Sequence, residues 1–199
     1  MSDLPFSQAS ENNKQPILAV LRSQLANTKT VLEIGSGTGQ HAVFFAEQLP
    51  HLTWQPSEQA QNIDMLSLRL DAQAPANVRK PVVVDVADDP WQVPRVNAVY
   101  AANCVHIMSW GHVEKMFHGL DKVLKSGGHL ILYGPYKYAG EFTSSSNAQF
   151  EQWLQGNAPL SGIRDFEKVD ELANRIGLTL LNDHQMPANN QCLVWQRKA

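Results

Sequence analysis

The feature that most constrains this chain is a glycine-rich stretch at residues 31–39, with the sequence VLEIGSGTG. Its apolar start is typical of a buried strand, and its three alternating glycines allow a sharp turn and a close approach of a ligand to the main chain. The amphipathic pattern of residues 40–48 predicts a helix directly after the turn. Because a helix N-terminus presents free N–H groups and a partial positive charge, the stretch predicts a strand–turn–helix unit that binds a nucleotide cofactor.

Three kinds of glycine-rich loop compete as explanations of this stretch. A phosphate-binding P-loop requires Lys followed by Ser or Thr after its last glycine, whereas Gln40 and His41 follow here. A dinucleotide-binding loop, G-x-G-x-x-G, requires its third glycine at the position of Gln40. The chain instead has a G-x-G-x-G pattern with Glu33 two residues before the first glycine, which disfavours both of these sites.

Composition is typical of a globular enzyme with a single domain over residues 1–199. The 199 residues are 43% hydrophobic and 18% charged, which is enough for a sizeable core. A net charge of −3 gives no reason to expect nucleic acid as a partner. No apolar stretch is long enough to cross a bilayer and the N-terminus lacks the features of a secretory signal, so we expect a cytoplasmic protein. Cys104 and Cys192 lie far apart, so no metal site is expected.

Strands and helices are expected to alternate along most of the chain, which predicts a parallel sheet with helices on both faces. The last two apolar segments, residues 178–185 and 192–196, are too close in sequence for a helical crossover and predict an antiparallel hairpin. The predicted fold is α/β, with a Rossmann-like, doubly wound, seven-stranded sheet that is mostly parallel. The other strands are expected at residues 30–34, 52–57, 81–85, 96–102 and 129–133, and helices at residues 12–25, 40–48, 59–70, 112–124 and 168–176, with residues 1–11 irregular and a glycine stop after the fourth helix at residues 126–128.

Polar side chains end four of the predicted strands: Glu33, Glu58, Asp85 and Asn103. In open α/β sheets ligands bind outside the carboxyl ends of the strands, so these side chains are expected to meet at one edge. An acid after the second strand can accept hydrogen bonds from ribose hydroxyls, and an acid after the third can accept one from an adenine amine. Each acid alone fits a helix cap or a solvated loop charge equally well. Three acids in register favour a ligand site.

The G-x-G-x-G turn, the acids and the closing hairpin together resemble the class I S-adenosylmethionine-dependent methyltransferases. The resemblance implies S-adenosyl-L-methionine as the cofactor. In that family's arrangement Gly35, Gly37 and Gly39 would line the methionine part, with Glu33 facing its amino group, Glu58 holding the ribose, Asp85 and the Val86 amide holding the adenine, and Asn103 near the sulfonium.

A closer resemblance covers nearly the whole chain. Residues 12–18, 140–147, 162–165 and 186–190 look like segments of a family of uncharacterised methyltransferase-like proteins in bacteria and animals, known mainly as a domain of unknown function. This resemblance implies the fold and the cofactor but supplies no substrate.

Candidate substrate-site residues lie in and beside a long insertion at residues 135–167, which we expect to form a substrate lid. His106, three residues after the fourth strand, is placed to act as a base, or equally to bond the main chain as an ordinary loop histidine. Within the insertion, Tyr136 is a candidate catalytic residue. Arg164 is either a clamp for a substrate carboxylate or phosphate, or an ion-pair partner of Asp165 or Glu167.

The N-terminal arm, residues 1–13, and the residue after it offer two further candidates. Asn13 and Lys14 are expected either to fold over the cofactor or to cap the first helix at the surface.

The sequence therefore predicts S-adenosylmethionine-dependent methyl transfer to an unidentified small or medium-sized acceptor. A small-molecule substrate is expected, with neither nucleic acid nor a membrane as a partner, and the oligomeric state is open. One alternative is a non-catalytic S-adenosylmethionine-binding protein that acts through partners. A nicotinamide-dependent oxidoreductase is disfavoured by Gln40 and by the terminal hairpin.

Overall fold

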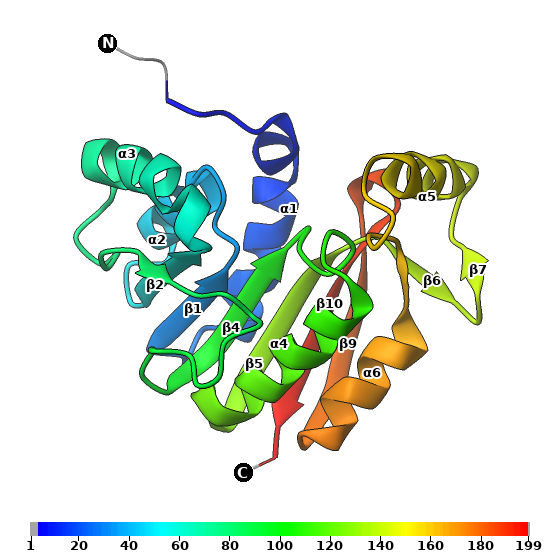
Figure 1. Ribbon diagram of the computed structural model, residues 1–199. Helices are drawn as coiled ribbons and strands as arrows, with labels where there is room; N and C mark the ends of the chain where they lie inside the picture. The colour runs from blue at the N-terminus through cyan, green and yellow to red at the C-terminus, as the bar shows by residue number, and fades with distance from the viewer. Residues whose placement is uncertain (1–3, 199) are drawn as a thin grey trace.

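The computed structural model describes residues 4–198, and a seven-stranded sheet runs through its centre (Figure 1). The strand order is β3-β2-β1-β4-β5-β10-β9. Neighbouring strands pair in parallel except at β10, which is antiparallel to both β5 and β9. The predicted fold class is confirmed, terminal hairpin included. The strands are β1 (Thr30–Ile34), β2 (Thr53–Glu58), β3 (Val82–Val83), β4 (Val96–Ala102), β5 (Leu124–Gly134), β9 (Leu178–Met186) and β10 (Asn190–Arg197).

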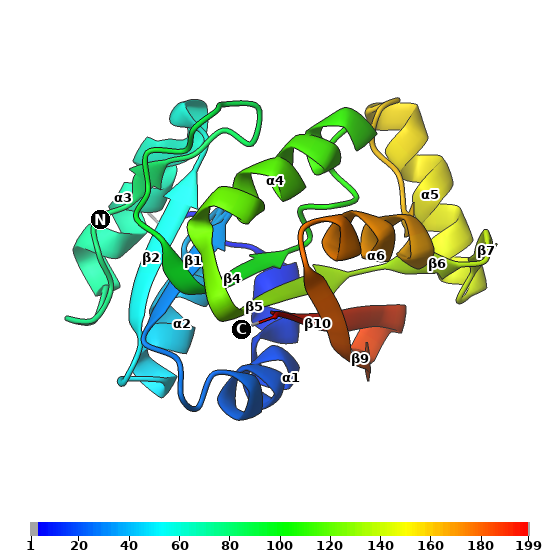
Figure 2. The same ribbon diagram turned by 90° about the horizontal axis from the view of Figure 1, so that it is seen from below.

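Helices cover both faces of the sheet, as Figure 2 shows. Because side chains alternate between the faces of a strand, the two faces have separate cores. Trp54 and Tyr100 belong to the core on the first face of the sheet, and Leu32 and Trp195 belong to the core on the second face. The first layer contains α1 (Gln8–Gln24), α2 (Gln40–Gln48) and α3 (Ile63–Gln73), with a 3₁₀ turn at Ala60–Asn62, and the second contains α4 (Trp110–Val123) and α6 (Phe166–Arg175). None of the helices in residues 4–198 has both the length and the apolar character needed to cross a membrane.

Several predicted boundaries were wrong, and two of them have a clear physical cause. Residues 8–11 are helical, because the Ser7 side chain caps α1 by accepting a hydrogen bond from the Ser10 amide at 3.2 Å. Gly127 and Gly128 do not stop a helix, since α4 ends at Val123 and β5 begins at the next residue. A Cβ at Gly128 would lie 2.8 Å from the carbonyl oxygen of Asn97, so a glycine there allows β5 to pack against β4.

The insertion at residues 135–167 contains more regular structure than the sequence indicated. Three short strands of the insertion form a second sheet in the order β7-β6-β8. The helix α5 of the insertion lies at the carboxyl end of the main sheet (Figure 1). Asn147 ties α5 to the connection between β9 and β10 by donating to the Asn189 carbonyl at 2.9 Å. The elements are β6 (Tyr136–Tyr138), β7 (Glu141–Phe142), α5 (Ser145–Asn157) and β8 (Arg164–Asp165).

Candidate functional site

The glycine turn after β1 has the backbone geometry that its sequence predicted. Gly35, Gly37 and Gly39 all adopt left-handed conformations, with φ of 68°, 54° and 76°. A Cβ at Gly35 would lie 2.7 Å from the sulfur of Cys104, so a side chain there would collide with the loop after β4. A Cβ at Gly37 would meet no atom within 4 Å. The turn therefore packs closely at its start and faces open space at its middle glycine.

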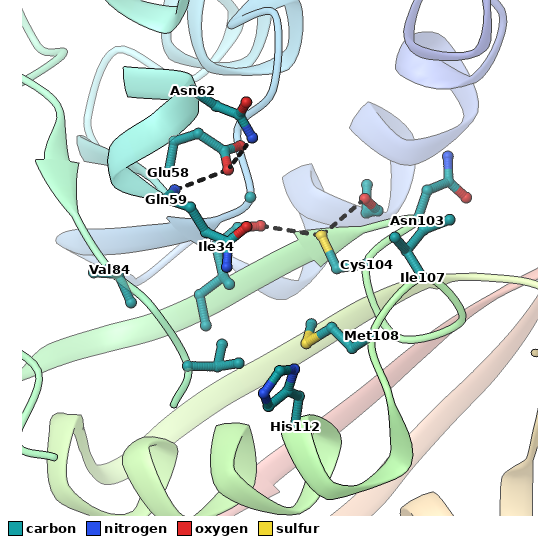
Figure 3. A pocket seen from close by; sticks show the side chains of 13 residues that line it. Ile34, Glu58, Gln59, Asn62, Val84, Asn103, Cys104, Ile107, Met108 and His112 are labelled. Carbon is teal, nitrogen blue, oxygen red and sulfur yellow. Dashed lines mark hydrogen bonds between the residues drawn. The ribbon is translucent and has the colours of Figure 1, made fainter. Parts of the chain in front are cut away.

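A cavity of about 270 Å³ lies where the strand order reverses, between the ends of β1 and β4 (Figure 3). This is the position where open α/β sheets bind ligands. Of the predicted cofactor residues it is lined by Gly35, Glu58, Val86 and Asn103. The wall is completed by Ile34, Gln59, Asn62, Val84, Ala102, Cys104, Ile107, Met108 and His112.

Glu58 joins the end of β2 to the glycine turn. Its Oε2 accepts a hydrogen bond from the Gly37 amide at 2.8 Å, and its Oε1 accepts one from the Gln59 amide at 2.9 Å. The Nδ2 of Asn62 lies 3.5 Å from the same Oε1, as Figure 3 shows. Because a carboxylate has about four acceptor positions, Glu58 can accept further hydrogen bonds from a ligand.

Asp85 lies at the same corner, directly between two residues of the cavity wall, Val84 and Val86. Its Oδ1 accepts from the Ala87 amide at 2.8 Å, and its Oδ2 accepts from the Gln59 side chain at 3.1 Å. Gln59 thus bridges the loops that carry the two acids. The structure brings Glu58 and Asp85 together, as the sequence indicated.

Glu33 does not reach the cavity. It is 2% exposed, and its Oε2 accepts a hydrogen bond from the Trp54 indole at 2.9 Å. Burial raises the pKa of Glu33 to about 7. The side chain at position 33 points to the same face of β1 as Val31, toward α1 and α2, whereas the cavity lies at the strand end. In this structure the carboxyl group of Glu33 therefore makes its contact within the core, and its expected contact with a methionine amino group stays a prediction.

Asn13 and Lys14 also lie away from the cavity. The Oδ1 of Asn13 is 2.7 Å from the Nε2 of His41, so this buried side chain ties α1 to α2. The Nζ of Lys14 lies 2.5 Å from the Oε1 of Glu11 and 5.0 Å from the centre of the Phe44 ring. It faces a separate depression on the outer side of α2. In this structure neither residue folds over the cavity.

The loop after β4 brings Asn103, Cys104 and His106 close to the end of β5. Asn103 has a left-handed backbone, with φ of 56°, and its amide donates to the Tyr133 carbonyl at 2.8 Å. A Cβ at Gly134 would lie 3.4 Å from the Nδ1 of His106 and 3.8 Å from the Oδ1 of Asn103. Burial raises the pKa of the Cys104 thiol to about 12, so this cysteine stays protonated.

His106 is buried beside the cavity, one residue before Ile107, which lines it. Its ring lies edge-on to Phe150, with centroids 5.5 Å apart. Burial, and secondarily the charge of Arg164, lower the pKa of His106 to about 4, so the imidazole is neutral at pH 7. None of the hydrogen bonds within residues 4–198 involves this imidazole, so the structure does not pair it with the main chain.

Arg164 binds main-chain carbonyls rather than open space. Its guanidinium donates to the carbonyls of Val105, Met108 and Leu160, the last at 2.8 Å. It forms no ion pair with Asp165 or Glu167 among the described residues. The predicted ion pair is therefore wrong, and the Nε and Nη2 groups bind carbonyls from two segments instead. Arg164 clamps the loop after β4 to the insertion.

Tyr136 is also outside the cavity. It is 1% exposed, lies in the core beneath α4 and α6, and its hydroxyl has no partner in the described part of the chain. Burial raises the pKa of Tyr136 well above that of an ordinary tyrosine. The structure gives Tyr136 no access to a substrate in this cavity.

The other nine wall residues were not predicted from the sequence as ligand contacts, and they include Asn62, Ile107, Met108 and His112. Asn62 and His112 lie at the starts of the helices that follow β2 and β4, where strand-end ligands are expected. That rule was a usable signal for both. Ile107 and Met108 are apolar loop residues, and no sequence pattern marks such residues as ligand contacts.

Comparison with known proteins places the chain beside methyltransferases in fold. The model of a family described as "Protein of unknown function (DUF938)" matches residues 4–197. An O-methyltransferase family protein from Burkholderia thailandensis has a TM-score of 0.81 at 17% identity, covering 94% of this chain and 56% of that one. The mitomycin 7-O-methyltransferase MmcR has a TM-score of 0.80 at 13% identity, covering 95% of this chain and 54% of that one. Human N-acetylserotonin methyltransferase, solved in complex with SAM, has a TM-score of 0.74 at 12% identity, covering 94% of this chain and 55% of that one.

These likenesses, at such low identity, show the fold. The chain spans slightly more than half the length of each of the three solved structures.

Proposed function

The chain belongs to the family described as protein of unknown function DUF938, and from the geometry of its cavity we propose that it is an S-adenosylmethionine-dependent methyltransferase acting on a small or medium-sized acceptor. The observation that carries this proposal is that Glu58, in the cavity wall, and Asp85, between the wall residues Val84 and Val86, are joined by Gln59. Two carboxylates beside a glycine turn match an adenosine group that offers a ribose diol and an exocyclic amine.

The rest of the wall fits the same ligand. Val84, Val86 and Met108 are apolar and suit the flat adenine ring, while the Val86 amide can donate to a ring nitrogen. The open space at Gly37 leaves room for a ligand against the main chain, so the methionine part would run along the turn toward Asn103. Glu58 would then hold the ribose and Asp85 the adenine amine.

Bound S-adenosylmethionine supplies an electrophilic methyl group on a sulfonium. The chain's own contribution is mainly to align an acceptor beside Asn103, because in-line transfer depends on orientation. His106 is neutral at pH 7, and its ring and the side chain of Asn103 both lie next to Gly134. We propose that His106 accepts a proton from an acceptor held there. A pKa of about 4 makes it a weak base, which suits an acceptor that needs little help in losing its proton.

The insertion at residues 135–167 would form the acceptor side of the site within a single domain. Gly162 donates its amide to the His106 carbonyl at 2.8 Å, and Ser161 donates its hydroxyl to the Ile107 carbonyl at 2.7 Å. Together with the Arg164 clamp, these bonds hold the insertion against the loop that carries His106. We therefore propose that this insertion is the substrate lid.

Calorimetry with S-adenosylmethionine, S-adenosylhomocysteine and NAD tests the proposal. Saturable heat with the two adenosyl ligands, a raised melting temperature and no response to NAD are the expected results. The absence of both effects with either adenosyl ligand would refute the proposal, and selective NAD binding would favour an oxidoreductase. Transfer of the labelled methyl group into a metabolite extract then distinguishes an enzyme from a non-catalytic binding protein.

A further inference from the structure

Four apolar side chains form a surface beside the cavity, which we call the apolar shelf: Ile107, Phe150, Trp153 and Leu160. Three of them are strongly exposed, Ile107 at 54%, Trp153 at 60% and Leu160 at 73%. They come from the loop after β4, from α5 and from the segment after α5. Single exposed apolar residues are common on proteins, but a group gathered from three segments at a cavity indicates a binding surface.

Two of the four side chains are in direct contact with each other, and one of these two reaches the loop after β4. The rings of Trp153 and Phe150 are stacked, with centroids 5.8 Å apart and planes inclined by 13°. Phe150 in turn touches the ring edge of His106. Ile107 lies next to His106 and also lines the cavity. Figures 1 and 2 both place α5 beside the loop that follows β4. The shelf therefore begins at the cavity and extends to Trp153.

The shelf is also held in a fixed position relative to the cavity. Arg164 donates to the carbonyls of both Leu160 and Met108, and Met108 is a cavity residue. Ser161 binds the carbonyl of Ile107 from the same side. A molecule lying on the shelf would consequently keep one end near His106 and Asn103.

The chemistry of the shelf selects its occupant. The charged side chains next to it are already engaged: Arg164 binds carbonyls, and the Oε2 of Glu151 accepts from the Ile163 amide at 2.5 Å. Because these two side chains carry opposite charges and lie close enough to influence each other, together they offer a ligand no net charge. A stacked, exposed indole favours a planar ring, which it can bind in an offset arrangement.

We propose that the apolar shelf binds the planar, uncharged, apolar part of the methyl acceptor, with the accepting atom directed toward His106. This inference rests on the proposed function, and it names the acceptor as an aromatic molecule of more than one ring.

The test is a titration of the full chain, saturated with S-adenosylhomocysteine, with 2-naphthol as a planar probe and decahydro-2-naphthol as its saturated counterpart. We expect saturable binding of 2-naphthol by calorimetry and weaker binding of the saturated alcohol. Trp153→Ala and Leu160→Ser should each weaken 2-naphthol at least fivefold, while Leu181→Ala, an exposed apolar residue on β9, should bind it as the wild type does.

The outcomes are distinguishable from those of the proposed function. All variants should keep the wild-type affinity for S-adenosylhomocysteine and the wild-type melting temperature, because the changed side chains are exposed. Failure of the wild type to bind S-adenosylhomocysteine would reject the proposed function itself. If that ligand binds but 2-naphthol does not, or binds Trp153→Ala equally well, the shelf is not an acceptor site. Concentration-dependent self-association that Trp153→Ala abolishes would instead make the shelf an interface between two copies, which also overturns the proposal.

Discussion

The indole of Trp54 donates a hydrogen bond to the buried carboxyl group of Glu33, across 2.9 Å and beneath the glycine turn. Burial raises the pKa of Glu33 to about 7, against an ordinary value of 4.5. The folded state therefore retains a proton that the unfolded state releases near pH 4.5. The stability contributed by this proton is complete at low pH and is lost as the pH rises through 7.

Glu33→Gln should remove this dependence, since its amide oxygen can still accept from Trp54. Between pH 4 and pH 8, the free energy of unfolding of the wild type should fall by about 3 kcal/mol more than that of the variant. Denaturant unfolding of both proteins at several pH values measures the difference. A difference that does not change with pH would mean that Glu33 is already ionised in the folded protein.

Glu58→Ala should weaken S-adenosylhomocysteine by roughly 1.5–3 kcal/mol, the usual value of a hydrogen bond to a charged group. The variant loses the expected ribose contact and also the bond to the Gly37 amide. Calorimetry measures the affinity, with Glu47→Gln on the exposed side of α2 as a control that should bind normally. Unchanged affinity in Glu58→Ala would assign the carboxylate to the turn alone.

Arg164→Ala should lower stability by roughly 1.5–3 kcal/mol and loosen the wall at Met108, raising the dissociation constant of S-adenosylhomocysteine about tenfold. Arg164→Lys should recover part of both effects, because an ammonium cannot match the planar fork that reaches three carbonyls. Arg175→Lys, at an exposed pair with Glu171, serves as the control. If Arg164→Ala melts and binds like the wild type, the clamp contributes nothing to the cavity.

His106 should show no titration above about pH 5.5, because burial and Arg164 lower its pKa to about 4. The unfolded chain takes up this proton near pH 6.5, so the contribution of His106 to stability is lost as the pH falls from 6.5 toward 4. His41, whose pKa burial also lowers to about 4, acts in the same direction. Imidazole NMR signals compared with those of His106→Gln provide the measurement. A signal assigned to His106 that titrates near pH 6.5 would contradict this prediction.

Turnover of His106→Gln should fall by about tenfold once an acceptor is known, which is less than the 10²–10⁴ expected for loss of a well-matched base. The rate of the wild type should be flat from pH 6 to pH 8. An inflection near pH 6.5 that the variant lacks would show that His106 is a stronger base than its burial implies.

The sequence predicted the parts of this protein that local patterns control. The strands at residues 30–34 and 96–102 and the helix at residues 40–48 agree to the residue, because apolar runs with clear ends define them. Glu58 and Asp85 meet as expected, since parallel strands end at one edge. The helix α5 escaped notice because only Asn147 and Leu154 are buried in its polar sequence.

The positions of single side chains were not predicted where long-range packing decides them. Glu33 and Tyr136 lie at strand ends, but a strand covered on both faces gives no signal of which face a side chain will take. Arg164 donates to the carbonyls of residues 105 and 108, more than fifty positions earlier in the chain. No pattern near Arg164 indicates that partnership.

The position of β10 sets the order in which this protein can be completed during synthesis. β10 lies between β5 and β9, although both of these strands precede it in the chain. As the nascent chain emerges, β5 therefore keeps an open hydrogen-bonding edge until residues 190–197 have left the ribosome. A premature stop before β10 would leave that edge exposed and remove Leu193 and Trp195 from the core. Because β9 pairs only with β10 among the described strands, these two strands complete the sheet together, as a hairpin that docks on the open edge of β5.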